Sequence, residues 1–90
     1  MRISQEKKDK ITEQILSYLF STFPNYPFTA EIAKEIARDE EFVKKLMLEL
    51  EKNELVSSIK KNTQGDIFSR RIRWRLSNKV YEIYHARQNN

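Results

Sequence analysis

The chain has 90 residues, contains no cysteine, and carries 17 Lys and Arg against 13 Asp and Glu, a net charge of +4. This length fits one domain, which we take as residues 1–90. The absence of Cys excludes a disulfide scaffold and a thiolate metal site, and it is typical of a cytoplasmic protein. We find no apolar run of the ~18 residues that a membrane span needs, and no signal peptide. We therefore expect a small, helix-rich, cytoplasmic domain.

The charge is unevenly distributed. Residues 1–28 carry +1, residues 29–57 carry −3 and residues 58–90 carry +6. Four arginines lie within six residues, at Arg70, Arg71, Arg73 and Arg75. This concentration indicates a polyanionic partner for the C-terminal third more clearly than the total charge does.

Two stretches have the apolar spacing of amphipathic helices. Residues 5–22 form the first, with a stripe of Ile11, Ile15 and Leu19, and Pro24 ends it. A second long stripe runs from Asp39, the predicted N-cap, to about Asn53; its apolar members are Val43, Leu46, Met47 and Leu50. Between the two, Thr29 is the predicted N-cap of a short helix that ends near Ala37.

The period then changes from that of a helix to that of a strand. Residues 55–61 and 67–76 predict a β-hairpin, with the only Gly, Gly65, in its turn. On the second strand one parity is largely apolar and includes Trp74, which we expect in the core, whereas the other parity is cationic. Ser77 is the predicted cap of a last helix over about 78–88. The fold class is therefore mainly α with a small β-hairpin (α+β), in the order helix, helix, helix, hairpin, helix.

The segments "TAEIAKEIA", "EEFVKKLMLELEKNELV" and "RWRLS" occur in that order between residues 29 and 77. This stretch, about half of the chain, resembles a winged helix-turn-helix domain. The resemblance implies a helix-turn-helix over about 29–53, a wing over about 55–76, and a third helix that enters the major groove of DNA. The small size and the composition are similar to those of stand-alone regulators of archaea and their viruses or plasmids.

Two features depart from the family pattern. Glu54 occupies a position where the family usually has Gly, and we expect Asn53 to adopt the left-handed conformation instead. Ala37 and Arg38 occupy the turn between the second and third helices, where Gly and an apolar residue are usual, and Phe42 is the candidate replacement for that apolar residue.

The predicted DNA contacts lie on the hairpin and on the third helix. Arginine and lysine neutralise phosphates, and Arg also reads guanine or a narrow minor groove. The alternative is that these are ordinary solvated faces. The predicted contact residues are Lys44, Lys45 and Leu48 on the helix and Lys60, Lys61, Thr63, Gln64, Arg70, Arg71 and Arg73 on the wing.

The apolar stripe of the first helix and the tyrosines of the last helix are a candidate dimer interface. Its residues are Ile11, Ile15, Leu19, Tyr81 and Tyr84. The alternative is that these side chains pack within their own domain. We expect a homodimer because a chain this short buries a small core.

No residue pattern indicates an enzyme, a cofactor or a metal site. His85 is the only histidine, and no second strong ligand stands at zinc spacing. Nothing beyond the aromatic loop at residues 23–28 suggests a small-molecule pocket. The sequence therefore predicts a double-stranded DNA-binding, homodimeric transcription regulator. The alternative is a winged-helix module that binds a protein or RNA and recognises no specific duplex.

Overall fold

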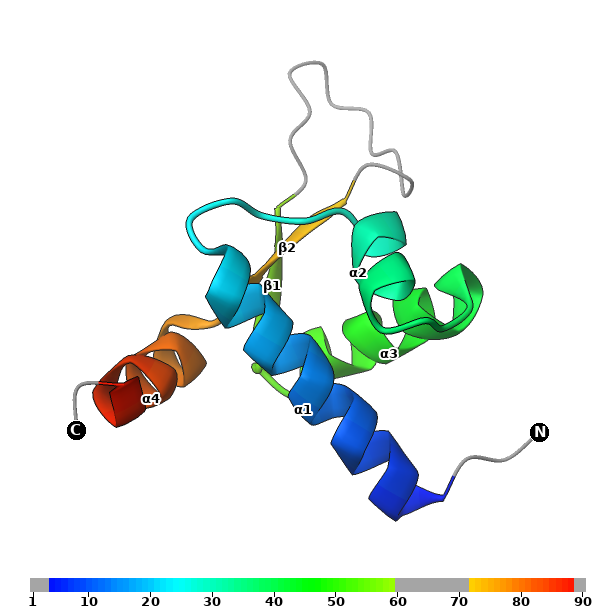
Figure 1. Ribbon diagram of the computed structural model, residues 1–90, viewed down its shortest axis with the longest axis horizontal. Coiled ribbons are helices and arrows are strands. Elements are labelled where there is room, and N and C mark those ends of the chain that lie inside the picture. Colours follow the sequence, from blue (N-terminus) through cyan, green and yellow to red (C-terminus); the bar gives the residue numbers. More distant parts are fainter. Residues whose placement is uncertain (1–3, 60–71, 89–90) are drawn as a thin grey trace.

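The computed structural model describes residues 4–59 and 72–88 (Figure 1). The element order is the predicted one. The elements are α1 (Gln5–Thr22), α2 (Thr29–Glu35), α3 (Glu40–Lys52), β1 (Val56–Ile59), β2 (Arg73–Leu76) and α4 (Asn78–Gln88). The predicted turn with Gly65 and the outer part of the hairpin lie outside the described residues.

Helix α1 begins and ends at the predicted residues. Ser4 caps it, because its Oγ accepts a hydrogen bond from Lys7 N at 3.2 Å. Phe23, which precedes Pro24, has φ −55° and ψ 137° and so leaves the helical region, as residues before proline do. The predicted stripe of Ile11, Ile15 and Leu19 is buried.

The start of α2 corrects the prediction for Thr29. Phe28, not Thr29, is the N-cap residue, and the Glu31 carboxylate accepts a hydrogen bond from Phe28 N at 2.7 Å. Thr29 is the first helical residue and is 2% exposed. Its Oγ1 accepts a hydrogen bond from Trp74 Nε1 at 2.8 Å. The Thr29 hydroxyl therefore accepts from the distant Trp74 indole and does not cap the first turn of α2.

Helix α3 confirms its predicted cap and its buried face. Asp39 Oδ2 accepts a hydrogen bond from Phe42 N at 3.2 Å. The four apolar residues of the stripe are all buried: Val43, Leu46, Met47 and Leu50. The ring of Phe42 packs against this core, as expected for the replacement of the usual turn residue.

Helices α2 and α3 are each followed by a residue in the left-handed region. Ala37 has φ 55° and Glu54 has φ 62°. The prediction for Asn53 is wrong, because its φ is −87°. Leu55 N donates to Leu50 O at 2.9 Å, and Arg38 N donates to Ala33 O at 3.0 Å. These are the long backbone bonds of the Schellman motif, which puts the residue after the C-cap in the left-handed region even without a Gly there.

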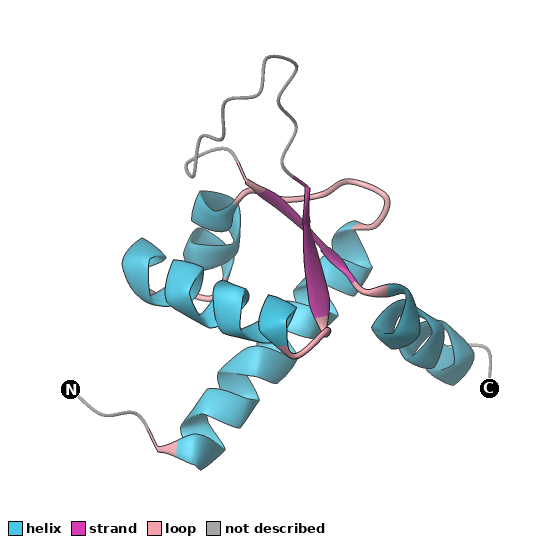
Figure 2. Cartoon of the chain, turned by 180° about the vertical axis from the view of Figure 1, so that it is seen from behind, coloured by secondary structure: helices cyan, strands magenta, loops and turns pink. Residues whose placement is uncertain are grey.

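Strands β1 and β2 are antiparallel, with Val56 opposite Leu76 and Ile59 opposite Arg73. The segment before α2 extends this sheet on the free edge of β2, which the sequence did not predict. Phe28 forms a bridge with Arg73, and Trp74 N donates to Pro27 O at 3.0 Å. Figure 2 shows the two strands between α4 on one side and α2 and α3 on the other.

The core is built from every element of the sheet and the helices. Trp74 is fully buried, as predicted, and belongs to one core cluster with apolar side chains of α1, α2 and α3, among them Ile15, Ile32 and Met47. Ser77 caps α4 as predicted, because its Oγ accepts from Val80 N at 3.3 Å. None of the helices in the described residues is long and apolar enough to cross a membrane.

Candidate nucleic-acid interface

The outward face of α3 combines lysines with an exposed apolar side chain. Because Val43, Met47 and Leu50 point into the core, Lys45 and Leu48 are exposed on the opposite face, and Lys44 is half-buried beside them. Leu48 is 46% exposed, although a side chain of this size gains by burial. Lys52 is also exposed one turn after Leu48, and our sequence prediction missed it. This face is therefore suited to contact with an anionic partner that also offers apolar atoms.

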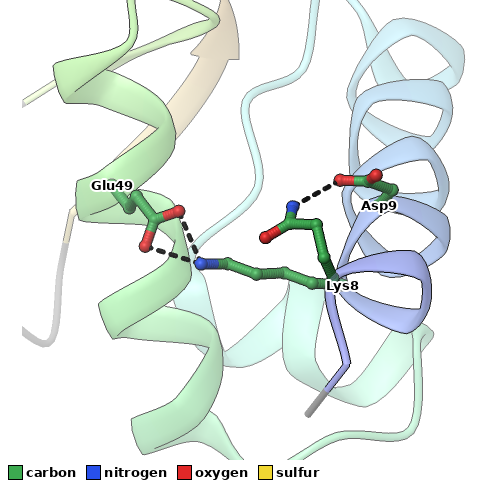
Figure 3. Close-up of polar contacts among 4 residues, drawn as sticks. Lys8, Asp9 and Glu49 are labelled. Atoms are coloured by element: carbon green, nitrogen blue, oxygen red, sulfur yellow. Dashed lines mark hydrogen bonds and ion pairs between the residues drawn. The ribbon is translucent and has the colours of Figure 1, made fainter.

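Acidic side chains lie at the start and on one flank of α3. Glu40 and Glu41 are exposed in its first turn, where carboxylates stabilise the positive end of the helix. Glu49 forms an ion pair with Lys8 of α1, in which Lys8 Nζ lies 2.7 Å from Glu49 Oε2 (Figure 3). This exposed pair adds less than about 1 kcal/mol to stability. It does place a cation beside the carboxylate that would otherwise repel phosphates from α3.

The two described arginines of the predicted cationic strand are anchored at the root of the wing. The guanidinium of Arg73 lies over the Phe28 ring, with Cζ 3.9 Å from the ring centroid, and its Nη1 donates to Tyr26 O at 2.6 Å. Arg75 Nη2 donates to Asn78 Oδ1 at 2.7 Å. A guanidinium has five N–H donors, so the exposed Arg73 keeps others for a ligand. The guanidinium of Arg73 therefore offers these remaining donors from a fixed position.

Only some of the predicted contact residues lie in the part of the chain that the structure describes. Lys44, Lys45 and Leu48 share one face of α3, and Arg73 lies at the wing end of β2, opposite Ile59. The apolar parity of the predicted second strand is confirmed in its described residues, because Ile72, Trp74 and Leu76 are all buried. The other predicted wing contacts lie outside the described residues; they are Lys60, Lys61, Thr63, Gln64, Arg70 and Arg71.

The predicted dimer interface needs a correction at its first helix. Ile11, Ile15 and Leu19 are 2%, 0% and 3% exposed, so their own chain already covers them. Tyr81 and Tyr84 are half-buried, and both ring centroids lie 5.6 Å from that of Phe20. The stripe of α1 is therefore explained by packing within one chain.

The aromatic loop and the start of α4 border a cavity of about 180 Å³. The rings of Phe23, Tyr26 and Tyr81 line it, together with the side chain of Arg75. Among the described residues, no group of three or more His, Asp or Glu side chains is placed to hold a metal ion.

Comparison with known proteins identifies the fold. No protein-family model and no curated protein matches the sequence. Solved structures do match. MepR, a transcription regulator of the Staphylococcus aureus multidrug efflux pump MepA, aligns with a TM-score of 0.65 and 22% identity over 93% of this chain. The chain has a winged-helix fold.

Two further winged-helix matches have the same TM-score. A complex of S. aureus MepR with DNA aligns with a TM-score of 0.65 and 22% identity over 93% of this chain and 73% of MepR. A mutant of Lactococcus lactis ZitR aligns with a TM-score of 0.65 and 21% identity over 99% of this chain and 56% of ZitR. The chain spans 64% of MepR in the first match, so these regulators are longer than the winged-helix unit described above. In this fold α2 and α3 form the helix-turn-helix, and β1 and β2 form the root of the wing.

Proposed function

We propose that this chain is a DNA-binding transcription regulator that places α3 in the major groove. The observation that carries the proposal is the outward face of α3, where Lys44, Lys45 and Leu48 lie together without being taken up by the core. Lysine donors bind phosphate oxygens or guanine O6 and N7, and an apolar side chain contacts the thymine methyl group. One helix face thus offers both positioning and base-reading contacts.

The structural neighbours support the same function. S. aureus MepR is a transcription regulator, and it has been solved in complex with DNA and, as a mutant, with an oligodeoxyribonucleotide. A sequence identity of 22% shows that the fold is shared and does not show a shared function. DNA binding by this chain is therefore our inference from the fold and the α3 face together.

The wing is the second proposed contact. The C-terminal residues 58–90 carry +6, most of it on the wing. The proposal for Arg73 is supported by its fixed position, because its guanidinium is held by the Phe28 ring and by Tyr26 O. From there we propose that it contacts the backbone or the minor groove. The proposed contacts of the outer wing are those predicted from the sequence: Lys60, Lys61, Thr63, Gln64, Arg70 and Arg71.

We further propose that the regulator acts as a homodimer, as its small core favours. Helix α4 offers Ile83, which is 49% exposed, beside Tyr84. Phe23, the residue that directly follows α1, is 45% exposed. Two copies joined there would present two α3 helices to half-sites about 34–36 Å apart on one side of the duplex. A cytoplasmic location and the likeness in composition to archaeal regulators stay predictions.

The test is a binding titration with a labelled duplex and a matched single strand over a range of salt concentrations. We expect duplex binding that weakens as salt rises, with a slope of about −0.9 per neutralised phosphate. Lys45→Ala should lower the magnitude of that slope by about 1. Lys79→Ala is the matched control, because it removes one exposed lysine from α4, which lies on the other side of the strands from α3 (Figure 2). Equal losses in both variants would show that only net charge matters.

The alternative function has one observation in its favour. Glu40 and Glu41 are exposed at the end of α3 that a helix-turn-helix inserts first, and carboxylates repel phosphates. A module that binds a protein or RNA tolerates these charges. Absence of duplex binding at low salt, or preference for the single strand, would favour this alternative.

A further inference from the structure

The side chain of Glu51 joins the third helix to the first strand of the wing. Its Oε2 accepts two hydrogen bonds from one residue, Ser58: from the backbone N at 3.1 Å and from Oγ at 2.7 Å. Glu51 lies in the last turn of α3, and Ser58 lies within β1 opposite Trp74. Both residues are half-buried. A carboxylate of the proposed recognition helix thus binds the backbone of the wing.

This contact satisfies an edge of the sheet. Trp74 N, across from Ser58, donates away from β1 to Pro27 O at 3.0 Å. In an antiparallel pair of this kind the opposite N–H also points outward, so Ser58 N is a free edge donor unless another element covers it. Glu51 covers it with an ionised acceptor, which forms stronger hydrogen bonds than a neutral one.

The other edge of the sheet is held by the beginning of α2. Thr29 Oγ1 accepts from Trp74 Nε1, and the guanidinium of Arg73 is fastened to Tyr26 O and to the Phe28 ring. The two helices of the helix-turn-helix therefore hold the root of the wing from both sides. Of these contacts, only the Glu51–Ser58 contact starts from α3 itself.

Glu51 also lies beside the proposed DNA-binding face. Residues three or four positions apart, and again seven apart, lie on the same side of a helix. Glu51 follows Leu48 by three positions and Lys44 by seven. The contact with the wing is therefore made along one margin of the surface that we propose enters the major groove.

We propose that Glu51 is a positioning residue, which fixes the root of the wing, β1 and β2, at a defined angle to α3 so that helix and wing reach one DNA duplex together. This inference rests on the proposed function. Glu51 itself does not touch DNA; it acts through Ser58. When the root of the wing is held before binding, less conformational freedom is lost on binding, so the Glu51–Ser58 contact increases affinity.

The contact is first tested without DNA, by amide hydrogen exchange followed by NMR. In Glu51→Ala the Ser58 amide should exchange at least about tenfold faster, because its acceptor is gone. The Trp74 amide, which donates to Pro27 O, is the internal control and should keep its rate. Unchanged exchange at Ser58 would overturn the inference.

The positioning role is then tested by DNA binding. Glu51→Ala should weaken duplex binding by about fivefold or more, and it should lower the magnitude of the salt slope by about 1 or more, because wing cations leave their phosphates. The loss of a negative charge alone predicts the opposite sign for affinity. Glu51→Gln, which keeps a neutral acceptor, should lie between Glu51→Ala and the natural protein.

Ser58→Ala provides a variant without a change in charge. It removes the Oγ bond and keeps the backbone bond, so its effect should have the same direction and be smaller than that of Glu51→Ala. Ser57→Ala is the matched control, because alternation along the strand places Ser57 on the other side of β1. Circular dichroism verifies that all four variants are folded.

The outcomes separate this inference from the proposed function. If the natural protein does not bind duplex DNA at low salt, the proposed function fails and the positioning role fails with it. If the natural protein binds and Glu51→Ala keeps its affinity and its salt slope, only the positioning role fails. A lower melting temperature with an unchanged salt slope would show that Glu51 is merely structural.

Discussion

The hydrogen bond between Thr29 and Trp74 provides the sharpest test of how this fold is held together. Thr29 is 2% exposed and Trp74 is fully buried, and their side chains are joined by a 2.8 Å bond from Nε1 to Oγ1. Thr29→Val keeps the shape of the side chain but removes the acceptor. The indole N–H then stays buried in the core without its protein partner.

The expected cost follows from that isolation. A buried donor that loses its acceptor costs about 1–3 kcal/mol, which is more than the net contribution of a typical hydrogen bond. For a domain of this size, each kcal/mol lowers the melting temperature by about 4–8 °C. We therefore expect Thr29→Val to lower the free energy of unfolding by about 2 kcal/mol, out of a total of about 5–15 kcal/mol.

The measurement is urea unfolding followed by fluorescence, since Trp74 is the only tryptophan of the chain. Thr29→Ser is the matched control: it keeps the hydroxyl and loses only a methyl group. Thr29→Val should be the less stable of the two, and the fluorescence of its folded state should shift. A Thr29→Val protein within about 0.3 kcal/mol of the natural one would refute the reasoning, because the buried indole would then need no acceptor.

Three further predictions concern the helix ends and a half-buried tyrosine. Asp39→Ala should cost about 1 kcal/mol by loss of the α3 cap, and Asp39→Asn much less, as measured by urea unfolding. Glu54→Gly should leave stability unchanged or raise it by up to about 1 kcal/mol, because φ 62° suits Gly. Asn53→Gly should destabilise the protein, because Asn53 has φ −87°, where Gly brings no such advantage. A Glu54→Gly protein less stable than the Asn53→Gly protein would contradict this backbone geometry. Burial raises the pKa of Tyr84 above its usual value, so the unfolded chain loses this proton at a lower pH than the folded chain does. Stability should therefore fall as the pH rises from about 10 through the folded-state pKa, and Tyr84→Phe should reduce that fall in melting temperatures measured across this range.

The sequence alone was enough for features that depend on neighbours in the chain. Helices α1 and α3 follow from apolar residues at three-to-four spacing, and the buried residues Val43 and Met47 were predicted from that spacing alone. The caps at Asp39 and Ser77 were also predicted, since an N-cap bonds an amide only three residues ahead. Alternation on β2 correctly placed Trp74 inside the core.

Predictions failed where two local readings were equally good. Asn53 and Glu54 are adjacent at the end of α3, and composition favours Asn for the left-handed position. The backbone bond from Leu55 N to Leu50 O determines instead that Glu54 takes it. Thr29 likewise has the right residue type for a cap, but its hydroxyl accepts a hydrogen bond from the indole of Trp74, 45 positions away.

Only the tertiary structure determined which partners these side chains meet. A stripe such as Ile11 and Ile15 shows that a helix face is buried, yet periodicity does not distinguish a second copy from the chain's own sheet. The ion pair of Lys8 with Glu49 and the contact of Glu51 with Ser58 depend on how α1, α3 and β1 pack, and no local pattern encodes them. The sequence therefore determined the elements, their inward faces and the concentration of positive charge in residues 58–90. The packing of the elements determined that the root of the wing is fastened to the helix-turn-helix, because hydrogen bonds and ion pairs between distant residues form only once the core has brought them together.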